Sequence, residues 1–129
     1  MLKESLKPEE RAIFTTIQIF SAEGNSGAEI EALWDTGASN TTISRIVAEH
    51  VGIKPEKEMP IYNANTLRTA HIGYCDIVLG DGTTFAHHPV YIDDLARIHC
   101  VIGMDIILKG DTSLTHSGDQ VVFQWNKQK

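Results

Sequence analysis

The sequence predicts an all-β domain with a barrel-like architecture. Short segments rich in Ile, Val, Phe and Thr recur along the chain, and turns rich in Gly, Asn and Asp separate them. Many short strands at such spacing are typical of barrels. A chain of 129 residues can form one hydrophobic core, so we expect a single domain over residues 1–129.

The first expected strands form a hairpin that ends at an acidic residue. Residues 12–20 and residues 28–34 both suit a strand, and a turn over residues 23–27 joins them. The second strand leads directly into Asp35. The hairpin therefore delivers a carboxylate to the end of a strand.

A short helix is expected after this hairpin, over residues 44–51. Ser44 can cap its first turn, and Gly52 can end it. Pro60 then punctuates the chain before strands resume. The expected apolar side of the helix comprises Ile46, Val47 and Val51.

The second half of the chain returns to strand patterns. Strands are expected over residues 61–63, 67–79, 85–92, 100–102 and 120–125, with turns at 64–66 and 80–82. One or two helical turns are expected over residues 104–109, with Asp105 near their positive end and Gly110 as their stop.

Composition and charge exclude several classes of partner. A hydrophobic fraction of 42% and a charged fraction of 22% are ordinary for a folded globular protein. The net charge of −6 comes without a cluster of Lys or Arg, so we expect no nucleic-acid partner. No apolar run approaches the roughly 18 residues that a membrane span needs, and residues 1–11 do not resemble a signal peptide. We expect no membrane partner, a cytoplasmic location, and a flexible N-terminal arm over residues 1–11.

The residues that carry chemistry begin with Asp35, Thr36, Gly37 and Ala38. An apolar strand that ends in an acid would bury the charge unless the following residues turn and solvate it. Gly37 lets backbone amides approach the carboxylate, and the Thr36 hydroxyl can donate to backbone. The simpler alternative is an ordinary Asx-type turn between two strands.

This motif, together with the later Val101-Ile102-Gly103, resembles the paired signatures of the retroviral-type aspartic peptidases (retropepsins) and their cellular and retrotransposon relatives. The resemblance extends roughly over residues 17–125. It implies a closed acid-protease barrel with one or two short helices, which is active as a two-fold homodimer on a peptide or protein substrate. It also implies that Ile102 and Gly103 pack behind the catalytic loop. Met104 and Asp105 follow Gly103 here, where viral enzymes usually carry an arginine. The resemblance therefore does not specify which ion pairs lie beneath the catalytic loop.

The resemblance assigns catalysis to Asp35. One carboxylate cannot be both general base and general acid in a single step, and the chain has no second Asp-Thr-Gly or Asp-Ser-Gly. A two-fold axis would supply the second Asp35, and the pair would share one proton. In this interpretation Thr36 braces the two loops, the Gly37 backbone contacts substrate, and no cofactor takes part.

A hairpin flap over the cleft is also implied by the resemblance. Its expected substrate-binding residues are Asn63, Ala64, Asn65 and Thr66. They lack the glycine-rich tip of viral enzymes, and a plain surface hairpin is the alternative.

The histidines and cysteines give weaker signals. The six histidines show no metal-ligand spacing, and the adjacent His87 and His88 should point to opposite faces of a strand, so we expect no metal site. Cys75 and Cys100 suit small core residues, and a disulfide between them stays open.

The sequence thus predicts an aspartic endopeptidase. Two alternatives remain: a catalytically inactive retropepsin-fold module for dimerisation or peptide binding, and a plain β-domain whose turn merely resembles the motif.

Overall fold

The computed structural model describes residues 1–24, 26–63 and 66–129, with Asn63 described by its backbone alone. Its strands are β1 (Leu2–Leu6), β2 (Phe14–Ser21), β3 (Gly27–Trp34), β4 (Thr42–Ser44), β5 (Lys57–Asn63), β6 (Thr66–Val78), β7 (Thr84–Asp93), β8 (Cys100–Ile102), β9 (Gly110–Ser117) and β10 (Gln120–Lys127). Its helices are a 3-10 turn (Pro8–Glu10), α1 (Arg45–Val51) and α2 (Met104–Ile107).

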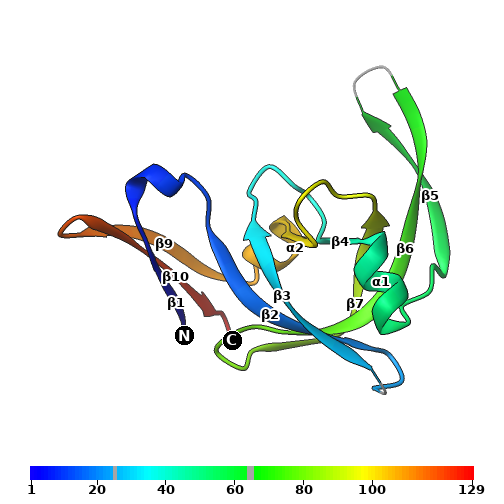
Figure 1. Ribbon diagram of the computed structural model, residues 1–129, viewed down its shortest axis with the longest axis horizontal. Coiled ribbons are helices and arrows are strands. Elements are labelled where there is room, and N and C mark those ends of the chain that lie inside the picture. Colours follow the sequence, from blue (N-terminus) through cyan, green and yellow to red (C-terminus); the bar gives the residue numbers. More distant parts are fainter. Residues whose placement is uncertain (25, 64–65) are drawn as a thin grey trace.

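Six of the strands close into a barrel. Their order is β2-β3-β8-β4-β7-β6, and antiparallel pairing between β2 and β6 completes the ring. Two neighbouring pairs, β3–β8 and β4–β7, are parallel. Strand β5 adds to β6 outside the ring, and the β5–β6 hairpin projects away from the barrel (Figure 1). The predicted all-β closed barrel with short helices is therefore confirmed.

The hairpin of β2 and β3 forms as predicted. The two strands pair from Phe14 opposite Leu33 to Phe20 opposite Gly27. Their inward-facing residues alternate with exposed ones, as expected for strands with one face on a core. The buried residues are Thr15, Ile17, Ile19 and Ser21 on β2, and Ala32 and Trp34 on β3.

Helix α1 begins and ends where the sequence indicates. The Ser44 hydroxyl accepts a hydrogen bond from the Val47 amide at 3.1 Å, and Gly52 ends the helix with a φ of 88°. The expected apolar side is wrong in one position, because Ile46 is exposed. Successive helical residues are rotated by about 100°, so the face that buries Val47, Ala48 and Val51 turns Ile46 to solvent.

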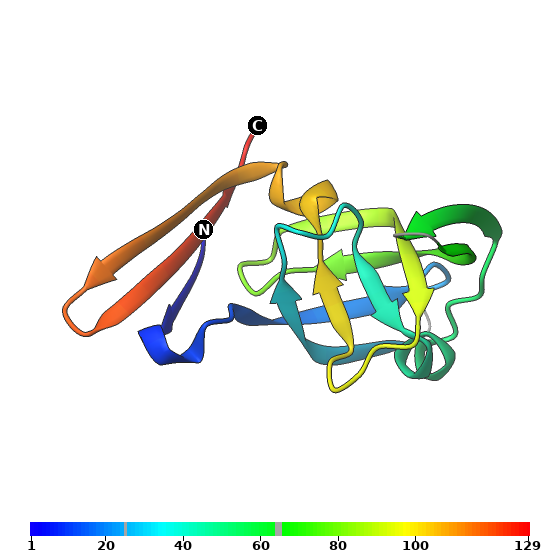
Figure 2. The same ribbon diagram turned by 90° about the horizontal axis from the view of Figure 1, so that it is seen from above.

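The structure corrects the expectation of a flexible arm over residues 1–11. Strand β1 pairs antiparallel with β10, and Leu2 is only 6% exposed. With β9, these strands form a second sheet of order β1-β10-β9, which lies to one side of the barrel (Figure 2). The backbone of β1 satisfies an edge of β10 that would otherwise be unpaired. The polar residues of β1 and β9 gave no strand pattern in the sequence.

Strand β5 also extends further than predicted. It starts at Lys57 and contains Pro60, which was expected to interrupt the chain. Because β5 pairs only with β6 and lies at the edge of the sheet, the missing amide of Pro60 removes no hydrogen bond from a central ladder.

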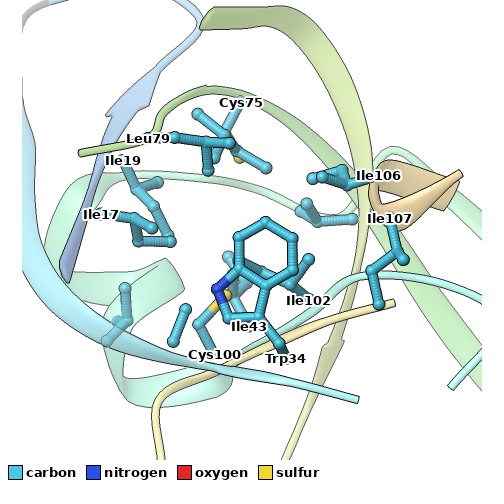
Figure 3. Packing of buried hydrophobic residues seen from close by; sticks show 14 of the residues in the cluster. Ile17, Ile19, Trp34, Ile43, Cys75, Leu79, Cys100, Ile102, Ile106 and Ile107 are labelled. Atoms are coloured by element: carbon cyan, nitrogen blue, oxygen red, sulfur yellow. The ribbon is translucent and has the colours of Figure 1, made fainter. Parts of the chain in front are cut away.

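One cluster of buried residues joins the barrel to the second sheet. The ring of Trp34, from the barrel, lies 5.0 Å from that of Phe123 and 5.9 Å from that of Trp125, both on β10. Figure 3 shows Trp34 within this cluster, which also contains Ile43 and Ile102. The end of β3, where Asp35 follows, is therefore anchored in the core. In the described part of the chain, neither α-helix has the length or the apolarity to span a membrane.

Candidate active site

Asp35 lies at the carboxyl end of the barrel strand β3, directly after Trp34. Strand β3 pairs with β8 so that Trp34 is opposite Ile102, and the Asp35 amide donates to the Ile102 carbonyl at 2.9 Å. The Asp35 side chain is half-buried. The strand pairing therefore fixes the backbone of Asp35 while its carboxylate remains accessible.

A tight turn comes directly after the carboxylate. The Gly37 amide donates to Oδ1 of Asp35 at 2.8 Å, and the Ala38 amide donates to the Asp35 carbonyl at 3.1 Å. A Cβ on Gly37 would lie 3.2 Å from the same Oδ1, which explains why glycine suits this position. Thr36, at the outer corner of the turn, is exposed in the single chain. The local geometry is that of an Asx turn, so the turn by itself does not distinguish an active site from a plain β-domain.

The second motif packs against the back of this turn. The Met104 amide donates to the Ala38 carbonyl at 2.8 Å, and the Asp105 amide donates to the Ser39 carbonyl at 3.2 Å. Ile102 is fully buried, and Gly103 lies against the loop backbone. The two motifs thus form one hydrogen-bonded unit, which an isolated turn between strands does not require.

Asp105 extends this unit below the loop. Its carboxylate accepts from the amide and the hydroxyl of Thr41, at 3.0 and 2.8 Å, and contacts Nε2 of His88 at 2.9 Å. Burial alone would raise the pKa of Asp105, but hydrogen bonds from His88 and Thr41 outweigh it and lower the pKa below its usual value. Sequence reasoning missed His88 in this role, and it noted Asp105 as a residue near the start of a helical turn and at the place of the viral arginine, without these partners. His88 and Thr41 lie far from Asp105 in sequence, so no local pattern signals these contacts.

The candidate flap is the hairpin of β5 and β6. Asn63 and Thr66 face each other across its end, while the expected tip residues Ala64 and Asn65 lie outside the described residues. Tyr62 and Leu67 form the next cross-strand pair, and both side chains are exposed. Two exposed apolar side chains on a projecting hairpin suit contact with another surface.

An ion pair links the flap to the barrel. Arg68 on β6 pairs with Asp93 at the end of β7, and the Arg68 guanidinium lowers the pKa of Asp93. Within the hairpin, His71 lies 3.6 Å from Glu58 on the opposite strand. The first contact ties the hairpin to β7, and the second joins its own two strands.

A cavity of about 520 Å³ lies between the barrel and the second sheet, beside Asp35. Apolar side chains from both sheets line most of it. An apolar cavity with one carboxylate at its wall suits an apolar side chain of a bound peptide or of another subunit. The apolar lining residues are Leu6, Ala12, Ile13, Leu33, Trp34, Leu114 and Val121, and Arg11 and Asp35 supply the charges.

The histidines and cysteines do not converge on a common point. Within the described residues, no group of three His, Cys, Asp or Glu side chains is placed to hold a metal ion. His87 stacks on Tyr74 with ring centroids 4.5 Å apart, while His88 turns to Asp105. Cys75 and Cys100 are buried free thiols, so the disulfide left open by the sequence does not form in this structure.

Comparisons with known proteins agree with this geometry. The family model described as aspartyl protease matches residues 20–106, which include both motifs. No curated protein matches the chain in sequence. The structure is similar to a retropepsin-like aspartic protease from Rickettsia conorii, with a TM-score of 0.58 and 15% identity over 95% of this chain and 91% of that chain.

Two further solved structures share the fold. The EIAV protease complexed with the inhibitor HBY-793 gives a TM-score of 0.57 and 14% identity, over 80% of this chain and 91% of that chain. The retroviral protease-like domain of Ddi1 from Leishmania major gives a TM-score of 0.50 and 16% identity, over 86% and 94%. With a family model that spans most of the chain and a barrel shared with these structures, the protein belongs to the aspartyl proteases of the retropepsin-like fold.

Proposed function

We propose that the protein is an aspartic endopeptidase, in which two copies of the chain each contribute Asp35 to a shared pair of carboxylates. The observation that carries this proposal is the hydrogen-bonded unit of the two motifs, which holds Asp35 at the end of β3 with its side chain half-buried. The exposed Thr36 at the corner of the same turn supports a contact with a second subunit.

A second carboxylate is required because one group cannot accept and donate a proton in the same step. Two other aspartates, Asp81 and Asp105, are already engaged in hydrogen bonds away from the Asp35 carboxylate. Asp81 holds the Thr83 amide in a hairpin turn at 3.0 Å, and Asp105 is directed at Thr41 and His88 behind the loop. Two-fold symmetry is the economical source of the partner.

Two Asp35 carboxylates on an axis would share one proton. At about 4 Å and an effective dielectric near 20, two such charges repel by roughly 4 kcal/mol, or about three pK units. The ionised carboxylate removes a proton from a water, whose oxygen attacks the scissile carbonyl carbon. The protonated carboxylate gives its proton to the carbonyl oxygen. When the tetrahedral diol collapses and its C–N bond breaks, the carboxylate that took the water proton gives a proton to the leaving nitrogen. The other carboxylate takes a hydroxyl proton from the diol, which becomes the product carboxyl group, so the pair again holds one proton.

The other residues of the motif have supporting roles in this proposal. Thr36 braces the two loops across the axis, the Gly37 backbone contacts the substrate, and Ala38 accepts the Met104 hydrogen bond that fixes the turn. The flap residues Asn63, Ala64, Asn65 and Thr66 cover the bound peptide.

An inactive module for dimerisation or peptide binding is the second candidate. The observation in its favour is the flap, which lacks glycine at its tip and carries exposed Tyr62 and Leu67. Such a hairpin could hold a peptide without the motion that turnover requires.

Asp35→Asn separates the two candidates. The amide keeps the shape of the side chain but cannot share a proton, so we expect loss of cleavage of a peptide library while sedimentation still shows a dimer. Asp81→Asn is the matched control and should cleave like the wild type. Activity should resist EDTA and serine or thiol reagents. A wild-type dimer without cleavage would favour the inactive module, and near-normal cleavage by Asp35→Asn would exclude Asp35 as the catalytic group.

A further inference from the structure

The carboxylate of Asp105 is saturated with hydrogen-bond donors. Oδ1 accepts from the Thr41 hydroxyl at 2.8 Å and from the Ile106 amide at 3.0 Å. Oδ2 accepts from the Thr41 amide at 3.0 Å, and Nε2 of His88 lies 2.9 Å from it. An ionised carboxylate offers about four lone-pair sites, so each has one partner here when Nε2 carries its hydrogen.

This carboxylate is also screened from solvent. The side chains of His88 and Asp105 are 13% and 20% exposed, and Thr41 is fully buried. A charge in such a place needs fixed partners, because leaving it without them costs far more than the net gain of an ordinary hydrogen bond. The low pKa of Asp105 agrees with a carboxylate that stays ionised under its donors.

Hydrogen bonds to the second motif define where the loop of Asp35 begins and ends. At its start, the Asp35 amide is bonded to Ile102. At its end, Thr41 is held by Asp105, and the Thr41 hydroxyl accepts in turn from the Gly103 amide at 3.2 Å. The Thr41 carbonyl accepts from the Tyr91 amide at 2.9 Å. The segment from Asp35 to Thr41 is therefore fastened at both ends to β8 and α2.

We propose that Asp105 and His88 form a positioning pair that sets the geometry of the Asp35 carboxylate through Thr41. The inference rests on the peptidase function proposed above. Neither residue of the pair touches the substrate. The Asp105 carboxylate accepts both hydrogen bonds that orient Thr41, and His88 contacts the same carboxylate. A shift of Thr41 moves the turn that carries Asp35. Displacements near 1 Å can cost on the order of a hundred-fold in rate, so a small loosening of this pair should be visible in turnover.

Asp105→Asn and Thr41→Val test the pair directly. In Asp105→Asn, the side-chain NH2 group replaces one carboxylate oxygen, so its hydrogens face the donors that this oxygen accepted from. In Thr41→Val, the side chain keeps its shape but loses its hydroxyl. We expect kcat to fall by about ten-fold or more, since positioning is lost, while KM changes little. Thr41→Ser keeps the hydroxyl and should restore near wild-type kcat. His88→Gln keeps a hydrogen-bond donor but loses the imidazole ring, and it should show a smaller loss of kcat.

Amide hydrogen exchange provides a readout that does not depend on cleavage. Exchange at residues 36–41 should accelerate by about ten-fold or more in Asp105→Asn and in Thr41→Val, because local opening of this loop becomes easier. Asp81→Asn, which changes another partly buried aspartate that holds a turn, should leave these amides unchanged. If the wild type cleaves no peptide, the peptidase proposal fails, and the exchange rates still decide whether the pair holds the loop.

Two results would overturn the proposal. One is unchanged exchange at residues 36–41 in every variant that folds. The other is an equal loss of kcat in Thr41→Ser and Thr41→Val, which would show that the hydroxyl is not the link. Should Asp105→Asn fail to fold, Thr41→Val and His88→Gln carry the same comparison.

Discussion

Gly103 lies against the backbone of Asn40, so closely that a Cβ on Gly103 would come within 2.7 Å of the Asn40 carbonyl carbon. The same Cβ would be 2.8 Å from the Asn40 oxygen and 2.9 Å from the Ala38 oxygen. All three contacts are with backbone atoms that the barrel and the motif hydrogen bonds hold in place. The second motif therefore needs a glycine because two chain segments cross there.

Gly103→Ala should separate these segments. We expect a destabilisation of about 1–3 kcal/mol or more from overpacking, together with a large loss of cleavage. Gly80→Ala is the control, because its Cβ would meet only the far end of the Leu2 side chain at 3.3 Å and the Thr16 oxygen at 3.6 Å. Urea unfolding at one protein concentration measures the stability of both variants. Equal stability of the two variants would mean that the crossing is looser than the structure has it.

The parts of this fold that the sequence predicted are those with a local signal. The hairpin into Asp35 alternates buried and exposed residues, and α1 carries a capping serine and a terminal glycine. The all-β class, the closed barrel and both motifs followed from such local patterns and from the family resemblance.

The parts that it missed depend on distant partners. Strands β1 and β9 hold polar, mostly exposed residues and exist because β10 offers them backbone hydrogen bonds. The contact of Asp105 with Thr41 spans 64 positions, and that with His88 spans 17. Nothing in the neighbourhood of either residue in the sequence indicates such a contact, so only the folded chain reveals the support beneath the loop.

Thr36→Ala should weaken the proposed dimer. Thr36 is exposed in the single chain, and a two-fold axis at Asp35 would bury its hydroxyl twice in one interface. The dimer dissociation constant should rise about ten-fold or more, at about 1.4 kcal/mol per decade. Thr36→Ser should stay close to the wild type. Concentration-dependent sedimentation of the three forms gives the constant, and an unchanged value in Thr36→Ala would place the loop away from the axis.

Acid should destabilise the protein through specific aspartates. The Arg68 guanidinium lowers the pKa of Asp93, and hydrogen bonds lower the pKa of Asp81 and of Asp105 against the opposing effect of burial. A folded-state pKa below the ordinary value of 3.8 means that folding favours the ionised form. This stabilisation is complete above the unfolded-state pKa and is lost as the pH falls through the folded-state value.

The melting temperature should therefore be nearly constant from about pH 7 to pH 5 and should fall below about pH 4. Asp105→Asn should melt lower at neutral pH and lose less on acidification, since it has no carboxylate to protonate at this place. Circular dichroism melts across the pH range measure both curves. Parallel curves for the two proteins would show that Asp105 contributes nothing to the acid dependence.

The two thiols should be unreactive in the folded protein. Burial raises the pKa of Cys75 to about 12, with a further contribution from Asp76, and burial also raises the pKa of Cys100. The thiolate is the reactive form, so little of it is present at pH 8. A chromogenic disulfide reagent should detect both thiols in urea and react with them only slowly in native buffer. Rapid native labelling would contradict the burial of these residues.

The hydrogen bond between Trp34 and Thr15 gives the last prediction. The indole Nε1 donates to the Thr15 hydroxyl at 2.9 Å in the core, directly before Asp35 in the chain. Thr15→Val keeps the shape of the side chain but leaves the buried indole hydrogen without an acceptor, which should cost about 1–3 kcal/mol. Thr15→Ser keeps an acceptor and should cost less.

A double-mutant cycle distinguishes this bond from simple packing. In a Trp34→Phe background no indole hydrogen remains to be satisfied, so adding Thr15→Val should be nearly neutral. Urea unfolding gives the free energies of unfolding of the wild type, the two single variants and the double variant. The protein concentration is held constant because the stability of a dimer depends on it. An additive cycle would mean that Thr15 acts only by filling space. A strongly non-additive one would show that this bond fixes the end of β3, from which Asp35 emerges.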